Sequence, residues 1–393
     1  MDLTYSDAEE AFRAEVAEWL AVNPPPRGAS GNTAEGFSLL RDWDRRLFDA
    51  GWAAVSWPAE YGGRDASLWE WLIFEEEYWR AGAPQRVSQN GISLLAPTLF
   101  EFGTDEQRAR ILPRMASAEE VWAQGWSEPD AGSDLAGITS RAVRAEGGWR
   151  LTGQKTWCSR GAFCDRLFGL FRSDPEAQRH AGITYCMVDL KADGVTVRPV
   201  QVLDGEEGFA EVFLDDVFVP DDDVIGEPGE GWSVAMATAS SERGLSLRSP
   251  GRFLATAARL VEMCRAQAPA DDPVLRDPVL RDAVVRAWMD AEAYQLFTLA
   301  TVTRLVEGDS KPGPSGPSER GKPGPEASLN KIWWSELDVR LHETALALLG
   351  DEAALDNEWT RGFEFALAGP IYAGTNEIQR NIAAQRILGL PRA

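Results

Sequence analysis

The first part of the chain places apolar residues with the period of a helix. In the stretch SDAEEAFRAEVAEWL, Phe12, Val16 and Leu20 recur at helical spacing, and Ser6 followed by Glu9 has the pattern of a helix N-cap. The stretch SLWEWLIFEEEYWRAGA repeats the helical pattern, and the Gly- and Pro-containing segment GWAAVSWPAEYGGRD connects the two. These patterns predict a helical N-terminal domain over residues 1–118.

Residues 119–226 have the shorter period of β-strands. The stretch SRAVRAEGGWRLTGQKTW alternates on both sides of Gly147-Gly148, as a hairpin should, and GVTVRPVQV and AEVFLDDVFVP add β-branched and aromatic runs. Because strands and helices do not alternate here, we expect an antiparallel β domain and not a Rossmann unit. The cluster GEPGEG at 226–231 has the wrong order of glycines for a phosphate-binding loop and stands among acidic residues.

The helical period returns over residues 227–393. Amphipathic segments are predicted near 231–248, 251–267, 279–306, 327–349 and 375–388, and their lengths favour a four-helix bundle. We expect the run Ser249-Pro250-Gly251 to kink or stop the first of these helices. Residues 308–328 contain KPGP twice and almost no apolar side chain, which predicts a surface loop inserted in the bundle. The predicted fold class is therefore α+β, with a helical domain, an antiparallel β domain and a four-helix bundle in that order.

Composition narrows the classes of function. The chain has 62 acidic and 39 basic residues, and its net charge of -23 would repel a polyphosphate backbone, so neither nucleic acid nor an anionic membrane is an expected partner. No stretch approaches the about 20 apolar residues of a membrane helix. The N-terminal stretch MDLTYSDAEEAF carries acidic residues where a signal peptide carries basic ones, so we expect a cytoplasmic protein. Four cysteines without a CxxC pair and two histidines favour buried thiols over a disulfide framework, a metal site or a His-based triad.

Two segments carry a specific resemblance to a known family. The first is AQGWSEPDAGSDLAGITSRA, 123–142, followed by LTGQKTWCSRGAFCD, 151–165; the second is the closing GTNEIQRNIAAQRILGLP. With GWAAVSWPAEYGG near the start and EVFLDDVFVPDDDVIG before the last helices, these segments resemble the acyl-CoA dehydrogenase family over nearly the whole chain, and the order of the domains is the family's order. The resemblance implies an FAD cofactor, an acyl-CoA substrate, and an electron-transfer flavoprotein or a similar acceptor.

The first signature suits a flavin in its chemistry. The pyrimidine edge of a flavin presents donors and acceptors, and a loop rich in Ser, Gly and Pro exposes backbone N–H groups and hydroxyls at close range. The resemblance places Ser133 against the acyl-CoA, and it assigns the flavin ring to Gln124, Trp126, Ser127, Trp157 and Ser159, the last of these near the reactive N5. Without the resemblance, Trp157 would be read as a core tryptophan and SEPDAGSD as an ordinary turn cluster.

The closing segment carries a second set of expectations. The resemblance assigns Thr375 and Glu377 to the adenosine side of the flavin, across a subunit boundary, while the sequence alone equally fits Thr375 as the cap of a solvated helix. Many relatives have at the position of Ala373 a glutamate that removes a proton from the substrate. Alanine cannot serve as a base, although its backbone N–H remains available to the thioester carbonyl.

Glu242 is the candidate for the missing base. Counting by three and four from Ala235 gives Ala239 and then Glu242, which interrupts a stripe of small and apolar positions. In the long-chain and isovaleryl branches of the family the base stands at the matching position, eleven residues after the glycine corresponding to Gly231 and directly before an arginine, and a small residue stands where this chain has Ala373. Arg243 would then contact CoA or orient the base, and a structural ion pair is the alternative. The alternative for Glu242 is a solvated helix face.

The chain also departs from the family pattern. Many homotetrameric relatives reach a neighbouring FAD through a Gln followed by GGxG and through an Arg-x-x-Phe loop, where this chain has ALALLGDEAALDN and DDPVLRDPVLRDAVV. Arg276 and Arg281 are the candidate replacements. Such changes resemble an actinobacterial subgroup, including enzymes that shorten sterol side chains, in which two different chains assemble. Both a homotetramer and a mixed tetramer therefore stay open.

The sequence as a whole predicts an FAD-dependent acyl-CoA dehydrogenase that forms a 2,3-enoyl-CoA. A variant of this prediction is the flavin-bearing subunit of a mixed tetramer acting on bulky acyl-CoA. Two rivals share the fold. One is a non-catalytic assembly subunit, and the other is a flavin oxidase or monooxygenase, because a fold by itself does not fix the reaction.

Overall fold

The computed structural model describes residues 4–243, 249–266, 277–307 and 324–391, except the side chains of residues 241–243 and 307. The chain divides into two compact units, each built from segments that are distant in sequence. One unit contains Met1–Pro24, Ser67–Ala83 and Arg243–Ala393, and the other contains Pro25–Ala66 and Pro84–Glu242. We call them the helical unit and the sheet unit.

The predicted order of helical, β and helical segments is confirmed. The N-terminal helices nevertheless belong to two different units. The helices α1 (Asp7–Val22) and α3 (Leu68–Arg80) lie in the helical unit, whereas α2 (Ala34–Asp49), α4 (Ala96–Phe102) and α5 (Asp105–Ala116) lie in the sheet unit. The domain boundaries at 118/119 and 226/227 therefore stay a prediction about the sequence segments.

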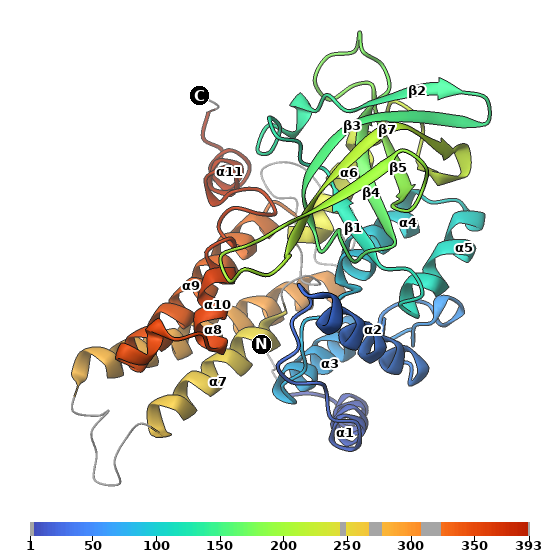
Figure 1. Ribbon diagram of the computed structural model, residues 1–393. Coiled ribbons are helices and arrows are strands. Elements are labelled where there is room, and N and C mark those ends of the chain that lie inside the picture. Colours follow the sequence, from blue (N-terminus) through green and yellow to red (C-terminus); the bar gives the residue numbers. More distant parts are fainter. Residues whose placement is uncertain (1–3, 244–248, 267–276, 308–323, 392–393) are drawn as a thin grey trace. The chain divides into compact units, whose positions relative to one another are not determined.

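The sheet unit is built on one curved eight-stranded sheet (Figure 1). Its strands are β1 (Trp122–Gly125), β2 (Arg141–Ala145), β3 (Gly148–Ser159), β4 (Arg166–Arg172), β5 (Ile183–Asp189), β6 (Val195–Val200), β7 (Phe209–Pro220) and β8 (Val224–Ile225). The main path runs β6-β7-β3-β2-β4-β5-β8, and β1 pairs with β4. The predicted hairpin is confirmed, because β2 and β3 pair antiparallel with Ala145 opposite Gly148.

The sequence predicted an antiparallel sheet, and this prediction is wrong for part of it. Strands β1 and β4 pair in parallel, and β2 also meets β4 in parallel at Arg141 and Arg172. A period of two determines which face of a strand is buried, but it leaves the direction of the partner strand open. The β2–β3 hairpin lies between β1 and β4 in the chain and gives the long crossover that a parallel pair requires.

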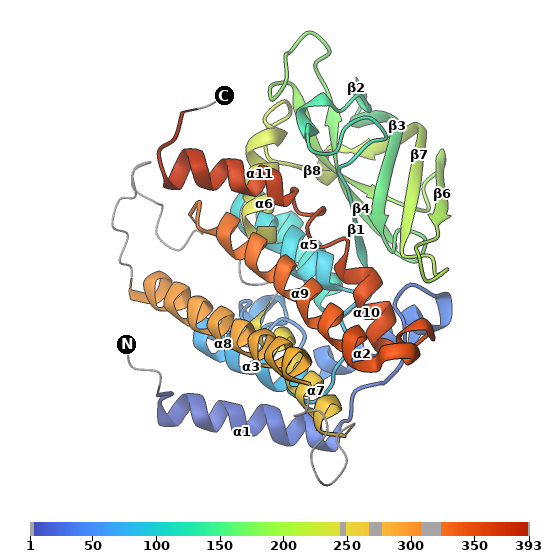
Figure 2. The same cartoon turned by 90° about the vertical axis from the view of Figure 1, so that its left-hand side faces the viewer.

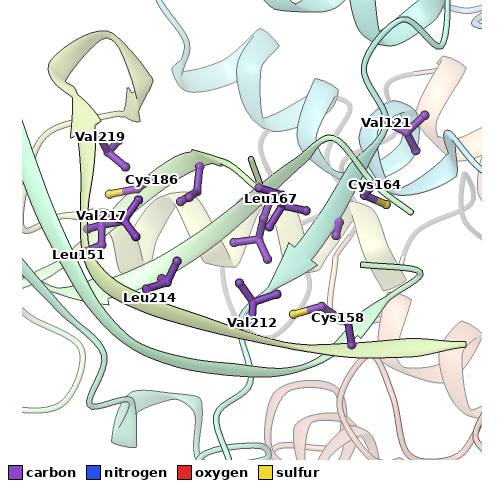
Figure 3. Close-up of a cluster of buried hydrophobic side chains, with 14 of the residues drawn as sticks. Val121, Leu151, Cys158, Cys164, Leu167, Cys186, Val212, Leu214, Val217 and Val219 are labelled. Atoms are coloured by element: carbon purple, nitrogen blue, oxygen red, sulfur yellow. The ribbon is translucent and has the colours of Figure 1, made fainter. Parts of the chain in front are cut away.

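Apolar side chains from opposite parts of the sheet meet in its interior (Figure 3). Cys158, Cys164 and Cys186 point into this cluster and are buried as free thiols. Burial raises the pKa of both the Cys158 and the Cys164 thiol to about 12, so these two groups stay protonated at neutral pH. The expectation of buried reduced thiols is therefore confirmed for these three residues.

Short helices attach to the sheet through directed polar contacts. The Gln107 side chain, at the start of α5, donates from Nε2 to the Val224 carbonyl at 2.6 Å and to the Asp222 carbonyl at 3.0 Å. The hydroxyls of Thr98 in α4 and Thr238 in α6 (Gly231–Arg243) share a hydrogen bond of 2.6 Å. Helix α6 is thereby fixed within the sheet unit.

The helical unit contains α7 (Pro250–Ala266), α8 (Pro278–Glu307), α9 (Ala327–Leu349), α10 (Glu358–Ala366) and α11 (Asn376–Ile382) besides α1 and α3. Figure 2 shows α7, α8 and α9 side by side, and α3 packs on α7. Their core includes Phe253, Tyr294 and Trp334, each with no exposed surface. The C-terminal helical region is confirmed, but α3 joins its packing from the N-terminal part of the chain.

The predicted break after the first C-terminal helix is confirmed at Ser249, which is not helical, and α7 begins at Pro250. The described part of α6 reaches Arg243, and residues 244–248 lie outside the described part of the chain. Proline suits a first helical turn, where its missing N–H costs no hydrogen bond. A Cβ on Gly251 would lie 2.8 Å from the Glu75 carbonyl oxygen and 2.9 Å from the Glu76 Cα, so α7 approaches α3 as closely as only glycine allows. Most of the predicted 308–328 insertion lies outside the described residues, and α10 was not predicted.

Candidate functional site

The segment after β1 and the end of β3 lie side by side in the sheet unit. Gln124 belongs to β1, Trp126 and Ser127 follow it, and Trp157 and Ser159 lie at the end of β3. The Thr156 backbone N–H donates to the Ser127 carbonyl at 2.9 Å. The structure therefore joins the two segments, distant in sequence, that carry the five residues assigned to the flavin ring.

Trp157 has both an unusual backbone and an unusual exposure. Its φ is +58°, in the left-handed region that costs a residue with a Cβ about 1–2 kcal/mol. The β3–β7 pairing shifts register between Lys155 and Cys158, so a bulge turns Trp157 outward while Cys158 stays buried. The indole is 61% exposed and contacts the Phe209 ring edge-on at 5.6 Å between centroids. Trp157 is therefore not the core tryptophan that the sequence without the resemblance suggested. Strained backbone of this kind is common at functional sites.

Trp126 has a buried N–H group that lacks a hydrogen-bond partner among the described residues. Its side chain is 9% exposed, and the group is the indole Nε1–H. Its ring meets Tyr185 edge-on at 6.4 Å. A buried donor without an acceptor is uncommon in folded proteins. A flat, acceptor-rich ring beside Ser127 and Trp157 would be bonded by such groups, so the residues present fit a flavin.

The predicted substrate contact, Ser133, lies in the loop that follows Ser127. Ser133 is exposed, and its neighbour Asp134 forms an ion pair with Arg179 at 3.1 Å. The loop begins with a backbone bridge between Glu128 and Ala131. Ser133 is thus close in the chain to the residues assigned to the flavin ring, and it is open to solvent.

Glu242 and Arg243 lie in the last turn of α6, and their side chains are outside the described part of the structure. Ala239 lies one turn earlier and Ala235 two turns earlier, and they are buried with 2% and 0% of their surface exposed. Helical periodicity places position 242 on the same face as these two alanines. The buried stripe is confirmed at the two alanines, and the base itself stays a prediction.

The closing segment belongs to the helical unit. Thr375 caps α11 by accepting the Ile378 N–H at 3.3 Å, and Glu377 is exposed in the first turn. The cap that the sequence allowed is therefore present, while the assigned contacts to adenosine stay a prediction. Arg281 is exposed at the start of α8, and Arg276 lies outside the described residues.

The loop before α11 has a left-handed backbone, with φ of +57° at Ala373 and +77° at Gly374. Gln379 donates from Nε2 to the carbonyls of Ala373 at 3.2 Å and Gly374 at 3.4 Å. The backbone that resemblance assigns to the thioester carbonyl is thus held by a side chain of the following helix.

A buried lysine anchors the same helix. Lys331 has no exposed surface and donates from Nζ to the Asn376 Oδ1 at 2.7 Å, where the Ser335 hydroxyl also donates at 3.1 Å. Sequence reasoning missed Lys331 and Asn376. A single lysine in the apolar run SLNKIWW was the available signal.

Metal ligands and membrane-spanning helices are the two remaining features. Among the residues that the structure describes, no group of three or more His, Cys, Asp or Glu side chains is arranged to hold a metal ion. Over the same residues, every helix is too short or too polar to cross a bilayer.

Comparison with known proteins assigns all three parts of the chain. Models of the N-terminal, middle and C-terminal domains of acyl-CoA dehydrogenases match residues 6–119, 123–217 and 229–388. The chain is 40% identical over 399 residues to acyl-CoA dehydrogenase IpdE1 of Mycobacterium tuberculosis and 38% identical over 406 residues to IpdE1 of Mycolicibacterium smegmatis, with 98% of each chain covered in both cases.

Solved structures match it over the full length. The ChsE4-ChsE5 complex from Mycobacterium tuberculosis has 29% identity and a TM-score of 0.84, and the Tcur3481-Tcur3483 steroid ACAD has 28% identity and a TM-score of 0.85. Both alignments cover 100% of this chain and 100% of the other.

Proposed function

The chain belongs to the acyl-CoA dehydrogenase family, and on this premise we propose that it binds FAD and oxidises an acyl-CoA to the 2,3-enoyl-CoA. The observation that carries the proposal is Trp157, an exposed residue on a left-handed backbone whose neighbour Thr156 donates to the Ser127 carbonyl. The Trp126 indole N–H, one residue before Ser127, has no partner among the described residues. Nothing in the folding of the sheet unit requires this exposure. A flat ring stacked on the indole accounts for it.

The protein residues would hold the flavin from two sides. Trp157 would cover one face of the isoalloxazine, and the Ser127 and Ser159 hydroxyls would bond its polar edge and approach N5. Gln124 and Trp126 would complete the ring contacts. Thr375 and Glu377 would contact the adenosine side of a flavin, in a second subunit by the family pattern. The bound FAD would supply the hydride-accepting centre of the reaction.

Glu242 would act as the base of the reaction. It would remove the proton from the α-carbon of the thioester, and the hydrogen on the β-carbon would leave as hydride, so the substrate would lose two protons and two electrons in all. A carboxylate beside the small residues Ala235 and Ala239 loses part of its hydration, which raises its affinity for a proton toward the value that the reaction needs. Arg243 would orient this carboxylate or contact CoA, as Ser133 would.

The backbone N–H of Ala373 would donate to the thioester carbonyl and stabilise the negative charge that develops there. The Gln379 side chain supports this role, because its two bonds hold the carbonyls of Ala373 and Gly374. The electrons would then pass to an external acceptor, an electron-transfer flavoprotein or a similar carrier.

We further propose that the substrate is a bulky acyl-CoA of the steroid type and that the chain works in a mixed assembly with a second, related chain. The support is the full-length similarity to a steroid ACAD and to the ChsE4-ChsE5 complex, each composed of two named chains. The present chain would be the flavin-bearing subunit, because it keeps both the flavin signature and Glu242. Anaerobic flavin reduction by short, long, branched and steroidal acyl-CoA thioesters tests the substrate class.

The base is tested by Glu242→Gln. This variant should keep the visible absorption of the bound flavin, and addition of an acyl-CoA that bleaches the wild-type flavin without oxygen should no longer bleach it. Glu230→Gln is the matched control, because Glu230 is an exposed acid directly before the same helix. Normal bleaching of the Glu242→Gln protein would overturn the assignment, and a wild-type protein purified without flavin would favour the assembly-subunit rival.

A further inference from the structure

The sheet unit buries one lysine completely, two residues before Trp157. Lys155 lies in the middle of β3 and has no exposed surface. Its ammonium donates to the Glu128 Oε1 at 2.7 Å and to the Leu170 carbonyl at 2.7 Å, and it lies 4.8 Å from the centroid of the Phe171 ring. The ammonium group therefore has three specific neighbours: a carboxylate, a backbone carbonyl and an aromatic ring.

The carboxylate of Glu128 joins the two ends of the loop 128–140, which contains Ser133. Besides Lys155, Glu128 accepts the Thr139 N–H at 2.6 Å, the Thr139 hydroxyl at 2.9 Å and the Ser140 N–H at 3.0 Å. Because residue 128 starts the loop and residues 139 and 140 end it, one carboxylate holds both ends. The same loop follows Ser127, whose carbonyl accepts the Thr156 N–H, so the loop and β3 are joined on both sides of the ion pair.

The two side chains influence each other's ionisation in opposite directions to their burial. Burial opposes ionisation of Glu128, but the Lys155 charge and the donated hydrogen bonds outweigh it and hold the pKa of that carboxyl below its usual range. Burial lowers the pKa of Lys155, and the charge of Glu128 counters this effect. The pair is thus a buried ion pair, and its side chains are only 0% and 5% exposed.

A buried ion pair is a poor device for stability alone. Apolar residues of similar volume in its place are often as stable or more stable, because they avoid the loss of hydration. The surroundings here would accept them, since Leu151, Cys158 and Phe171 form an apolar core next to Lys155. Hydrogen bonds to charged groups fix the direction and distance between the segments that they join, whereas apolar contacts do not.

We propose that the Glu128–Lys155 ion pair is a positioning device, which fixes the Ser127–Ser133 loop against the end of β3 that carries Trp157 and Ser159. This inference rests on the proposed function. The one ion pair would position the residues for two ligand contacts. Ser127 and Trp157 would contact the flavin, and Ser133 would contact CoA. Glu128 and Lys155 touch neither ligand and act only through these neighbours.

The test compares Lys155→Met with Arg166→Met in the full-length protein. Arg166 forms ion pairs with Glu120 at 2.9 Å and Asp223 at 3.3 Å, and both partners lie outside the loop and the end of β3. Both changes remove the cation of a buried or half-buried ion pair in the same unit. Only the change at Lys155 should alter the candidate site.

Three measurements separate positioning from folding. In the flavin-free protein, hydrogen exchange of the Thr139, Ser140 and Thr156 amides should accelerate in Lys155→Met and stay protected in Arg166→Met. The dissociation constant of FAD should rise about tenfold to a hundredfold in Lys155→Met, the factor that one hydrogen bond to a charged group supports. The KM for an acyl-CoA should rise with it, while Arg166→Met keeps both values within about twofold of wild type.

A double variant protects the test against loss of folding. Glu128→Gln with Lys155→Met leaves no unpaired charge and should regain much of the wild-type unfolding temperature, but not its FAD affinity, since the link from Lys155 to Leu170 is missing. If the double variant or Lys155→Met binds FAD and acyl-CoA like Arg166→Met, the ion pair is only structural and the inference fails. If the wild-type chain itself binds no FAD, the proposed function fails first.

Discussion

Replacing Trp157 by glycine separates what this residue does for the fold from what it does for the ligand. The indole is 61% exposed, so about two fifths of its roughly 250 Å², or about 100 Å², is covered by protein. At about 25 cal/mol per Å² this contact is worth about 2.5 kcal/mol. Glycine relieves the left-handed strain at φ +58°, which returns about 1–2 kcal/mol. The flavin-free protein should therefore lose only about 1 kcal/mol of unfolding free energy.

The effect on FAD binding should be larger. Stacking of one flat ring on an aromatic side chain is worth about 1–3 kcal/mol, so the dissociation constant of FAD should rise by about tenfold to a hundredfold. Quenching of flavin fluorescence on titration with flavin-free protein measures this constant, and urea unfolding of the same samples measures stability. Trp288→Ala is the control, because Trp288 is 45% exposed on α8 and has no assigned role.

Two results would refute the reasoning. If Trp157→Gly binds FAD as tightly as wild type, the indole does not cover the flavin, and its strain and exposure need another cause. If the flavin-free variant loses several kcal/mol, Trp157 supports the fold and its exposed surface is incidental.

Three further predictions test other parts of the structure. Asn376→Ala removes the acceptor of the buried Lys331 ammonium and the Ser335 hydroxyl, so it should cost about 2–4 kcal/mol in urea unfolding, and a loss below about 0.5 kcal/mol would contradict the buried network. Burial raises the pKa of Asp44 in the folded protein above its value in the unfolded chain. The stability of the wild-type protein is therefore highest while Asp44 is protonated, and part of it is lost as the pH rises through the folded-state pKa. Asp44→Asn should therefore gain stability over wild type between pH 4 and pH 8, and an advantage that shrinks with rising pH would contradict this. Of the four thiols, only Cys264 is not fully buried, so a thiol reagent should modify one cysteine in the native protein and four after unfolding; rapid modification of two or more would contradict the packing.

Local patterns in the sequence predicted the individual elements well. The Ser6–Glu9 cap starts α1, and the segment predicted at 327–349 is α9. The predicted turn joins β2 to β3 at Glu146-Gly147, and Gly148 is already the first residue of β3. These features depend on side chains within a few positions of each other, so the sequence contains all the information they need. The short helix α10 escaped detection because it has barely three turns of periodicity, although Asn357 caps it.

The residues of the candidate site were predicted by resemblance, and their spatial arrangement was not. The motif spacing suggested that Ser127 and Trp157 act together, and the Thr156–Ser127 hydrogen bond joins their segments. No pattern in the sequence indicated that Trp157 has a left-handed backbone or that Lys155, two residues earlier, is buried. Both follow from a bulge in the β3–β7 pairing, which depends on the partner strand.

By itself, the amino-acid sequence determined the type and order of the elements, because helix and strand periods, caps and turns are short-range properties. Only the tertiary structure decided that α3 packs with α7, that β1 runs parallel to β4, and that Glu128 meets Lys155 inside the sheet unit. Such contacts join residues that are distant in the chain. Their free energy comes from burial and from hydrogen bonds that exist only when the whole unit has folded.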